Sequence, residues 1–161
     1  MRAMNLEARS LYAAGALVLA LLMSRQSLAE GGDPIEVKTT AAVRHGHELI
    51  PADRVVPGDE VFYTLEIKNT GSTPLPTPTV DFAIPAHMRY VANSAVGAGA
   101  EVSYSIDGGR TFGRPESLTV AGDGGEPRAA TAAEYTHIRW RLKHVLKSKA
   151  MALARFRAIV K

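Results

Sequence analysis

The chain has 161 residues, which is enough for one domain of ordinary size. Apolar residues make up 46% of it and charged residues 22%, a composition typical of a globular protein rather than a disordered one. The sequence contains no cysteine, which excludes disulfide bonds and cysteine nucleophiles. The net charge of +3 is too small to predict a nucleic-acid-binding or membrane-binding role.

Residues 1–29 have the three-part layout of a secretory signal peptide. Arg2 and Arg9 give a positive start, residues 11–23 form an apolar run, and residues 27–29 offer small side chains for cleavage. The apolar run is shorter than the roughly 20 residues that a helix needs to cross a bilayer. We therefore predict a signal-peptide helix, export to the periplasm or the cell surface, and no stable membrane insertion after cleavage. A retained membrane anchor is the alternative.

Residues 30–161 are predicted to form a single all-β domain. Cleavage after residue 29 removes three arginines and one glutamate, so the net charge falls from +3 to +1. Pro and Gly then interrupt alternating apolar segments about every ten residues, the pattern of a sandwich or barrel. The first predicted strand is residues 35–43. The clearest is residues 61–68, where apolar and polar side chains alternate over eight positions.

The rest of the chain continues this pattern. Residues 69–72 form a turn, and the prolines of residues 73–78 exclude that segment from the interior of a sheet. Further strands are predicted at residues 80–84, 90–94, 101–106, 138–142 and 156–160, with a loop at residues 122–127 and a turn of helix within residues 129–134. Seven or eight strands predict an antiparallel immunoglobulin-like β-sandwich, with a core around Trp140, Tyr63, Phe82 and Phe156.

The order of several short motifs resembles one bacterial family. Pro57-Gly58-Asp59, Lys68-Asn69-Thr70-Gly71, Ile84-Pro85 and Tyr90-Val91-Ala92-Asn93-Ser94 follow one another in the chain. This arrangement is similar to the conserved-repeat domain known as domain-of-unknown-function family eleven, over roughly residues 39–161. The resemblance implies an immunoglobulin-like β-sandwich of exported and surface proteins. It also implies a structural or adhesive role, without a defined activity.

No arrangement of residues predicts catalysis or metal binding. The serines have no Gly-x-Ser-x-Gly context, which a hydrolase nucleophile would favour. His45 and His47 would share one face of a strand, but a metal site needs a third ligand, and Glu48 would point away. Asp59 and Glu60 are adjacent, so their carboxylates diverge on a strand rather than converge on a substrate. We predict that the protein is not an enzyme and has no cofactor.

The sharpest local motif is the segment Ser105-Ile106-Asp107-Gly108-Gly109-Arg110-Thr111-Phe112. It resembles the Asp-box hairpin of sialidase propellers, in which the aspartate caps turn amides and the aromatic ring packs beneath. The chain is too short for a propeller of several blades. We predict a structural hairpin here. The alternative is a loop that contacts a carbohydrate or a cation.

The last strands carry a local excess of positive charge. After Glu134 the chain has eight basic residues and no acidic residue. Alternation places Arg139, Arg141 and Lys143 on the outward face of one strand, and Arg155 and Arg157 on that of the next. If these strands pair, the five side chains form one basic face. Such a face is either a solvated surface that protects a sheet edge or a binding surface for an acidic partner.

These patterns predict a non-catalytic, exported structural or binding module of the bacterial cell envelope. The predicted partner is an envelope protein or an anionic envelope component, such as an anionic glycan or a lipid headgroup, and not nucleic acid. The alternative is a glycan-binding or glycan-processing accessory protein that uses the Asp107 hairpin.

Overall fold

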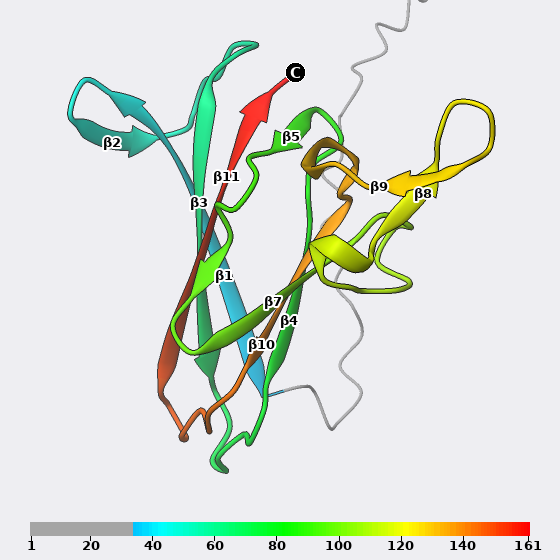
Figure 1. Ribbon diagram of the computed structural model, residues 1–161. Helices are drawn as coiled ribbons and strands as arrows, with labels where there is room; N and C mark the ends of the chain where they lie inside the picture. The colour runs from blue at the N-terminus through cyan, green and yellow to red at the C-terminus, as the bar shows by residue number, and fades with distance from the viewer. Residues whose placement is uncertain (1–33) are drawn as a thin grey trace, which may run out of the picture. The chain divides into compact units, whose positions relative to one another are not determined.

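The computed structural model describes residues 34–161, so the predicted signal-peptide helix lies outside the described residues. The described chain is all-β with antiparallel pairing, as the sequence predicts (Figure 1). Nine strands form two facing sheets, and the other two form a separate hairpin. Within residues 34–161 there is no helix that is long and apolar enough to cross a membrane.

The larger sheet has six strands in the order β2-β1-β3-β11-β5, and β6 also pairs with β11. Its strands are β1 (Ile35–His45), β2 (Glu48–Pro51), β3 (Glu60–Asn69), β5 (Met88–Tyr90), β6 (Val96–Gly97) and β11 (Met151–Val160). β3 and β11 are its long central strands, and they pair with Tyr63 opposite Phe156. The β1–β2 hairpin extends beyond the facing sheet at the upper left of Figure 1.

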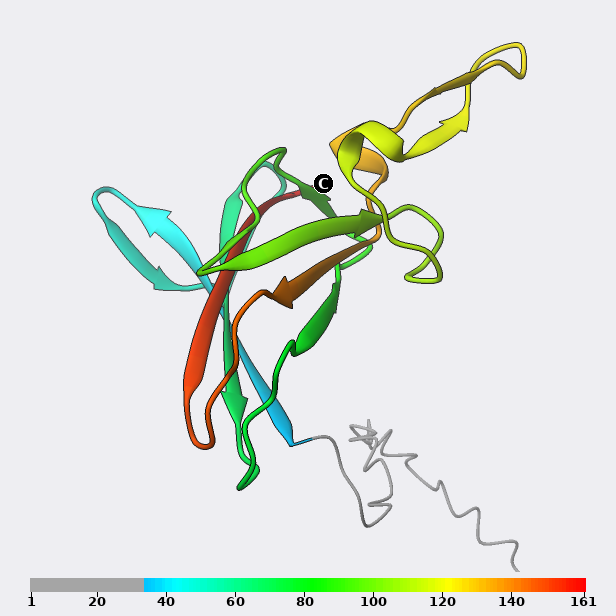
Figure 2. The same cartoon turned by 60° about the horizontal axis from the view of Figure 1, so that its bottom comes forward.

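The smaller sheet has the order β4-β10-β7, and its strands are β4 (Thr79–Ala83), β10 (His137–Leu142) and β7 (Ala100–Ser105). A separate hairpin of β8 (Thr119–Ala121) and β9 (Pro127–Ala129) projects from the end of this sheet (Figure 2). Two short 3-10 helices, η1 (Pro115–Ser117) and η2 (Ala132–Glu134), flank that hairpin in the chain.

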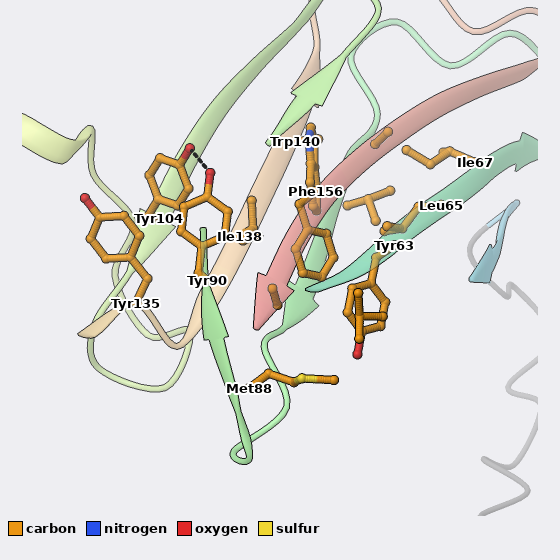
Figure 3. Packing of buried hydrophobic residues seen from close by; sticks show 14 of the residues in the cluster. Tyr63, Leu65, Ile67, Met88, Tyr90, Tyr104, Tyr135, Ile138, Trp140 and Phe156 are labelled. Atoms are coloured by element: carbon orange, nitrogen blue, oxygen red, sulfur yellow. Dashed lines mark hydrogen bonds between the residues drawn. The ribbon is translucent and has the colours of Figure 1, made fainter. Parts of the chain in front are cut away.

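The core lies between the two sheets and is centred on aromatic rings (Figure 3). Trp140 of β10 is fully buried, and its ring lies 6.1 Å from that of Phe156 in β11. Tyr63 of β3 stacks on Phe156 at 4.6 Å, and Phe82 of β4 completes the group at 5.1 Å from Phe156. These are the four core aromatics that the sequence predicts. Apolar alternation on β3 and β11 directs one face of each strand inward, toward this core.

The structure contains more strands than predicted, eleven within the described residues. The additional strands are β2, β6, β8 and β9, each of two to four residues. Strands this short show no alternating pattern in the sequence, because alternation is recognised only over about four to eight residues. They are extended because they pair with a neighbouring strand. The strand predicted at residues 90–94 is wrong in its bounds, because β5 ends at Tyr90 and a turn follows. Residues 122–126 of the predicted loop form the tip of the β8–β9 hairpin, whereas Pro127 begins β9. The predicted turn of helix is η2.

Asn69, at the end of β3, ties the connection between β10 and β11 to the larger sheet. Its side chain is completely buried and donates hydrogen bonds to the carbonyls of Thr73 at 2.8 Å and Leu146 at 3.0 Å. Its Oδ1 accepts a hydrogen bond from the N–H of Gly71 at 2.9 Å. The predicted Asn-Thr-Gly turn therefore also anchors the segment that carries the chain from one sheet to the other.

Candidate functional site

The outer face of the smaller sheet carries two arginines from its central strand. Arg139 and Arg141 alternate with the buried Ile138, Trp140 and Leu142 along β10, so they point away from the core. The flanking strands supply their counter-ions. Arg139 lies opposite Asp81 of β4, and its Nε and Nη2 each lie 2.7 Å from one carboxylate oxygen of that residue.

A second carboxylate, Glu101 of β7, is shared between two arginines. It lies opposite Arg141, whose Nη2 donates to its Oε2 at 2.6 Å, while Nη2 of Arg114 donates to its Oε1 at 3.1 Å. These two guanidinium groups lower the pKa of Glu101 to about 2, mainly through the hydrogen bonds that they donate. Glu101 is therefore a carboxylate at neutral pH, and it offsets only one of the two positive charges beside it.

Arg114 and Phe112 reach this face because the Asp107 hairpin folds back along β7. Asp107 accepts hydrogen bonds from the N–H of Arg110 at 3.1 Å and of Thr111 at 3.0 Å, and from the Thr111 hydroxyl at 2.6 Å. The Ser105 hydroxyl also donates to it at 2.6 Å. These donors, led by the Ser105 and Thr111 side chains, hold the pKa of Asp107 far below its usual range.

The hairpin itself needs glycine at two consecutive positions. Gly108 and Gly109 have φ angles of 77° and 84°, a backbone conformation that other residues adopt only at a cost. Asp107 thus caps turn amides, as the structural interpretation of this motif predicts. The aromatic residue differs from expectation: Phe112 packs on the outer face, with the Arg139 guanidinium 3.7 Å from its ring centroid.

Together these groups line an open hollow of about 280 Å³, which we call the arginine hollow. It is lined by Thr79, Glu101, Ser103, Phe112, Gly113, Arg114, Arg139 and Arg141. Arg141 and Arg114 are the most accessible of its charged groups, with 61% and 67% of their side chains exposed. Three arginines face two carboxylates, so the arginine hollow with its Asp81 neighbour has one positive charge in excess.

The single basic face predicted from the last strands is not formed. The structure places β10 and β11 in different sheets, so Arg155 and Arg157 lie on the opposite outer face from Arg139 and Arg141. Arg157 is paired with Glu60 at 2.8 Å. Lys143 lies just beyond the end of β10 and is exposed. Alternation shows which way a side chain points, but not to which sheet its strand belongs, and this is why the prediction is wrong.

Two charged residues of the arginine hollow, Arg114 and Glu101, were not predicted from the sequence. Arg114 lies two residues after the hairpin motif, and Glu101 lies on an alternating strand that precedes it. A hairpin that returns along β7 would bring Arg114 close to Glu101, so the hairpin motif and the strand before it could have predicted this ion pair. The predicted histidine pair, His45 and His47, lies at the exposed β1–β2 turn. Within residues 34–161, no three histidine or acidic side chains are grouped as metal ligands would be.

Comparisons of the chain with protein-family models, with curated proteins and with solved structures found no match. The resemblance to the conserved-repeat family therefore stays a prediction, and the geometry of the arginine hollow is the basis for a functional proposal.

Proposed function

We propose that this protein is a non-catalytic module, exported to the cell envelope, that binds an anionic glycan in the arginine hollow. The immunoglobulin-like character of the sandwich and its membership of a conserved-repeat family of surface proteins are part of the same proposal. The observation that carries it is the sharing of Glu101 by Arg114 and Arg141, which leaves a positive charge available on an accessible, concave surface.

The charges of the arginine hollow favour an acidic ligand. A guanidinium group presents several donors in a plane, which matches the two oxygens of a carboxylate. Glu101 occupies only part of the donor capacity of Arg141 and Arg114. A second carboxylate, supplied by a ligand, would complete the coordination of both guanidinium groups.

The other groups in the arginine hollow favour a sugar as the carrier of that carboxylate. Ser103 and Thr79 bring hydroxyl groups, and Phe112 brings apolar surface. Sugars combine C–H surface with hydroxyls, so such a mixture of aromatic and polar groups fits them. The two acids beside the site favour binding over hydrolysis. Asp81 is engaged by Arg139 through both oxygens, and the low pKa of Glu101 makes it a poor proton donor at neutral pH.

The test is titration of the purified chain with a tetramer of galacturonic acid and with a neutral glucose tetramer as the uncharged probe. The informative variant is Arg114→Gln/Arg141→Gln. Its matched control is Arg155→Gln/Arg157→Gln, which removes the same charge from the opposite outer face. Because hydrogen bonds to charged groups each contribute about 1.5–3 kcal/mol, we expect binding of the acidic tetramer to weaken at least about tenfold in the first variant. The control should bind as the unmodified chain does.

Each other result contradicts a particular part of the proposal. Equal losses in the two double variants would mean that binding follows overall charge rather than the arginine hollow. Unchanged binding in both would exclude the arginine hollow as the site. Equal affinity for the neutral tetramer would exclude the acidic group as the basis of recognition. Binding should also weaken as salt is raised, because the charges involved are accessible to solvent.

A further inference from the structure

The first strand of the larger sheet has an open edge over most of its length. β1 pairs with β3 along Ile35–Val43, but on its other side β2 pairs only with residues 42–45. Among the described residues, no strand covers residues 35–40 on that side. Residues 36–40 are all exposed, and Val37 keeps 40% of its surface accessible. A long, regular and uncovered edge is a template for pairing with another strand.

The hydrogen-bonding groups of this edge can be assigned from the contacts at its two ends. The carbonyl of Pro34 accepts from Thr70, on the β3 side, and the carbonyl of Ala41 accepts from Ala52, on the β2 side. Successive residues of a strand direct their N–H and C=O groups to opposite sides. Ile35, Val37 and Thr39 therefore present their main-chain donors and acceptors to the open edge.

The side chains along the edge are complementary to a second copy of themselves. In an antiparallel pair centred on Val37, each Val37 lies opposite the Val37 of the second copy. Glu36 then lies opposite Lys38 of the second copy, and Lys38 opposite its Glu36. Shifting the register by two residues in one direction would place Lys38 opposite Lys38, and in the other direction Glu36 opposite Glu36. Like charges at opposing positions are destabilising, so one register is favoured over its neighbours.

The next strand extends the same pattern. Glu36 lies opposite Lys68 of β3, and Lys38 lies opposite Glu66. With a second copy in place, the outward side chains would form rows that cross four strands with alternating charge: lysine, glutamate, lysine, glutamate. Val37 lies on the other face of the sheet, so its exposed side chain would pack against its twin.

We propose that this protein forms a two-fold symmetric dimer in which the β1 edges of two copies pair antiparallel around Val37. The pairing would add about six main-chain hydrogen bonds and join the two larger sheets into one continuous sheet. This use of an exposed edge is the same as in peptide recognition by strand addition, with a second copy as the added strand. The proposal is independent of the arginine hollow, which lies on the outer face of the other sheet.

The test uses sedimentation equilibrium of the purified chain from micromolar to roughly millimolar concentration, a range that covers weak association. Lys38→Glu leaves only glutamates at the two charged edge positions, and Glu36→Lys leaves only lysines. Each variant by itself should associate about tenfold or more weakly than the unmodified chain, because both opposite-charge pairs become like-charge pairs. An equimolar mixture of the two variants should recover the association as a heterodimer.

The control is Lys143→Glu, which makes the same change of charge at an exposed position just beyond β10 of the smaller sheet and should leave the dimer intact. The proposal is overturned if the unmodified chain is monomeric over the whole range. It is also overturned if it associates but neither edge variant weakens the association, since another surface would then be responsible. Failure of the mixed variants to associate would exclude the register centred on Val37.

Discussion

Replacement of Asn69 by alanine should strongly destabilise the sandwich. The side chain makes three hydrogen bonds to main-chain groups from a fully buried position. A neutral hydrogen bond contributes about 1 kcal/mol net, so the three together amount to about 3 kcal/mol. The carbonyl of Leu146 also accepts from the N–H of Leu75 and keeps that partner, which limits the loss. We expect the free energy of unfolding to fall by about 2–4 kcal/mol.

The neighbouring residue provides a matched control. Thr70 makes one side-chain hydrogen bond, from its hydroxyl to the carbonyl of Pro34 at 2.9 Å, in an exposed environment. Thr70→Ala should therefore cost less than about 1 kcal/mol. Urea denaturation is the assay, with the fluorescence of Trp140 as the signal, because it is the single tryptophan and is completely buried. If Asn69→Ala and Thr70→Ala have equal effects, Asn69 does not anchor the connection between the sheets.

Two further predictions concern the arginine hollow and its hairpin. The pKa of Glu101 is lowered from 4.5 to about 2, so its interactions stabilise the folded state above pH 4.5, and this contribution is lost as the pH falls toward 2. Carboxyl NMR titration of the Arg141→Gln variant should show the pKa of Glu101 moving back up. An unchanged pKa would contradict the assigned cause. Asp107→Ala should remove the acceptor of the Arg110 and Thr111 amides. Hydrogen exchange at these two amides should therefore accelerate, while exchange in the buried strand β10 stays slow. Unchanged exchange at the two amides would show that the turn keeps its structure without the aspartate cap.

The arginine hollow shows how the surroundings of a local motif determine which residues it brings together. The Asp107 hairpin is held mainly by hydrogen bonds within residues 105–111, and Gly108 also donates to the hydroxyl of Thr136. The hairpin's position against β10 forms the site proposed to bind a ligand, since it brings Phe112 over Arg139 and Arg114 to Glu101. The two sequence-based interpretations, a basic binding surface and a glycan-contacting hairpin, thus concern parts of one surface.

The sequence by itself determined the class of the fold, the strands that form the core and the fold of the Asp107 hairpin. Alternation along β3, β10 and β11 depends only on the two-residue period of an extended chain, so local sequence is enough to show which side chains are buried. The aspartate cap and the paired glycines act within a few residues, so this turn can also be recognised locally.

Only the tertiary structure decided how the strands are distributed between the sheets. The sequence alternates equally well in β10 and β11, and nothing in either strand shows that the chain changes sheets between them. That choice is made by contacts far apart in the chain, among them the hydrogen bond from Asn69 to Leu146 and the packing of Trp140 on Phe156. It separates Arg155 and Arg157 from Arg139 and Arg141. The site therefore follows from strand pairing, a non-local property that no local pattern records.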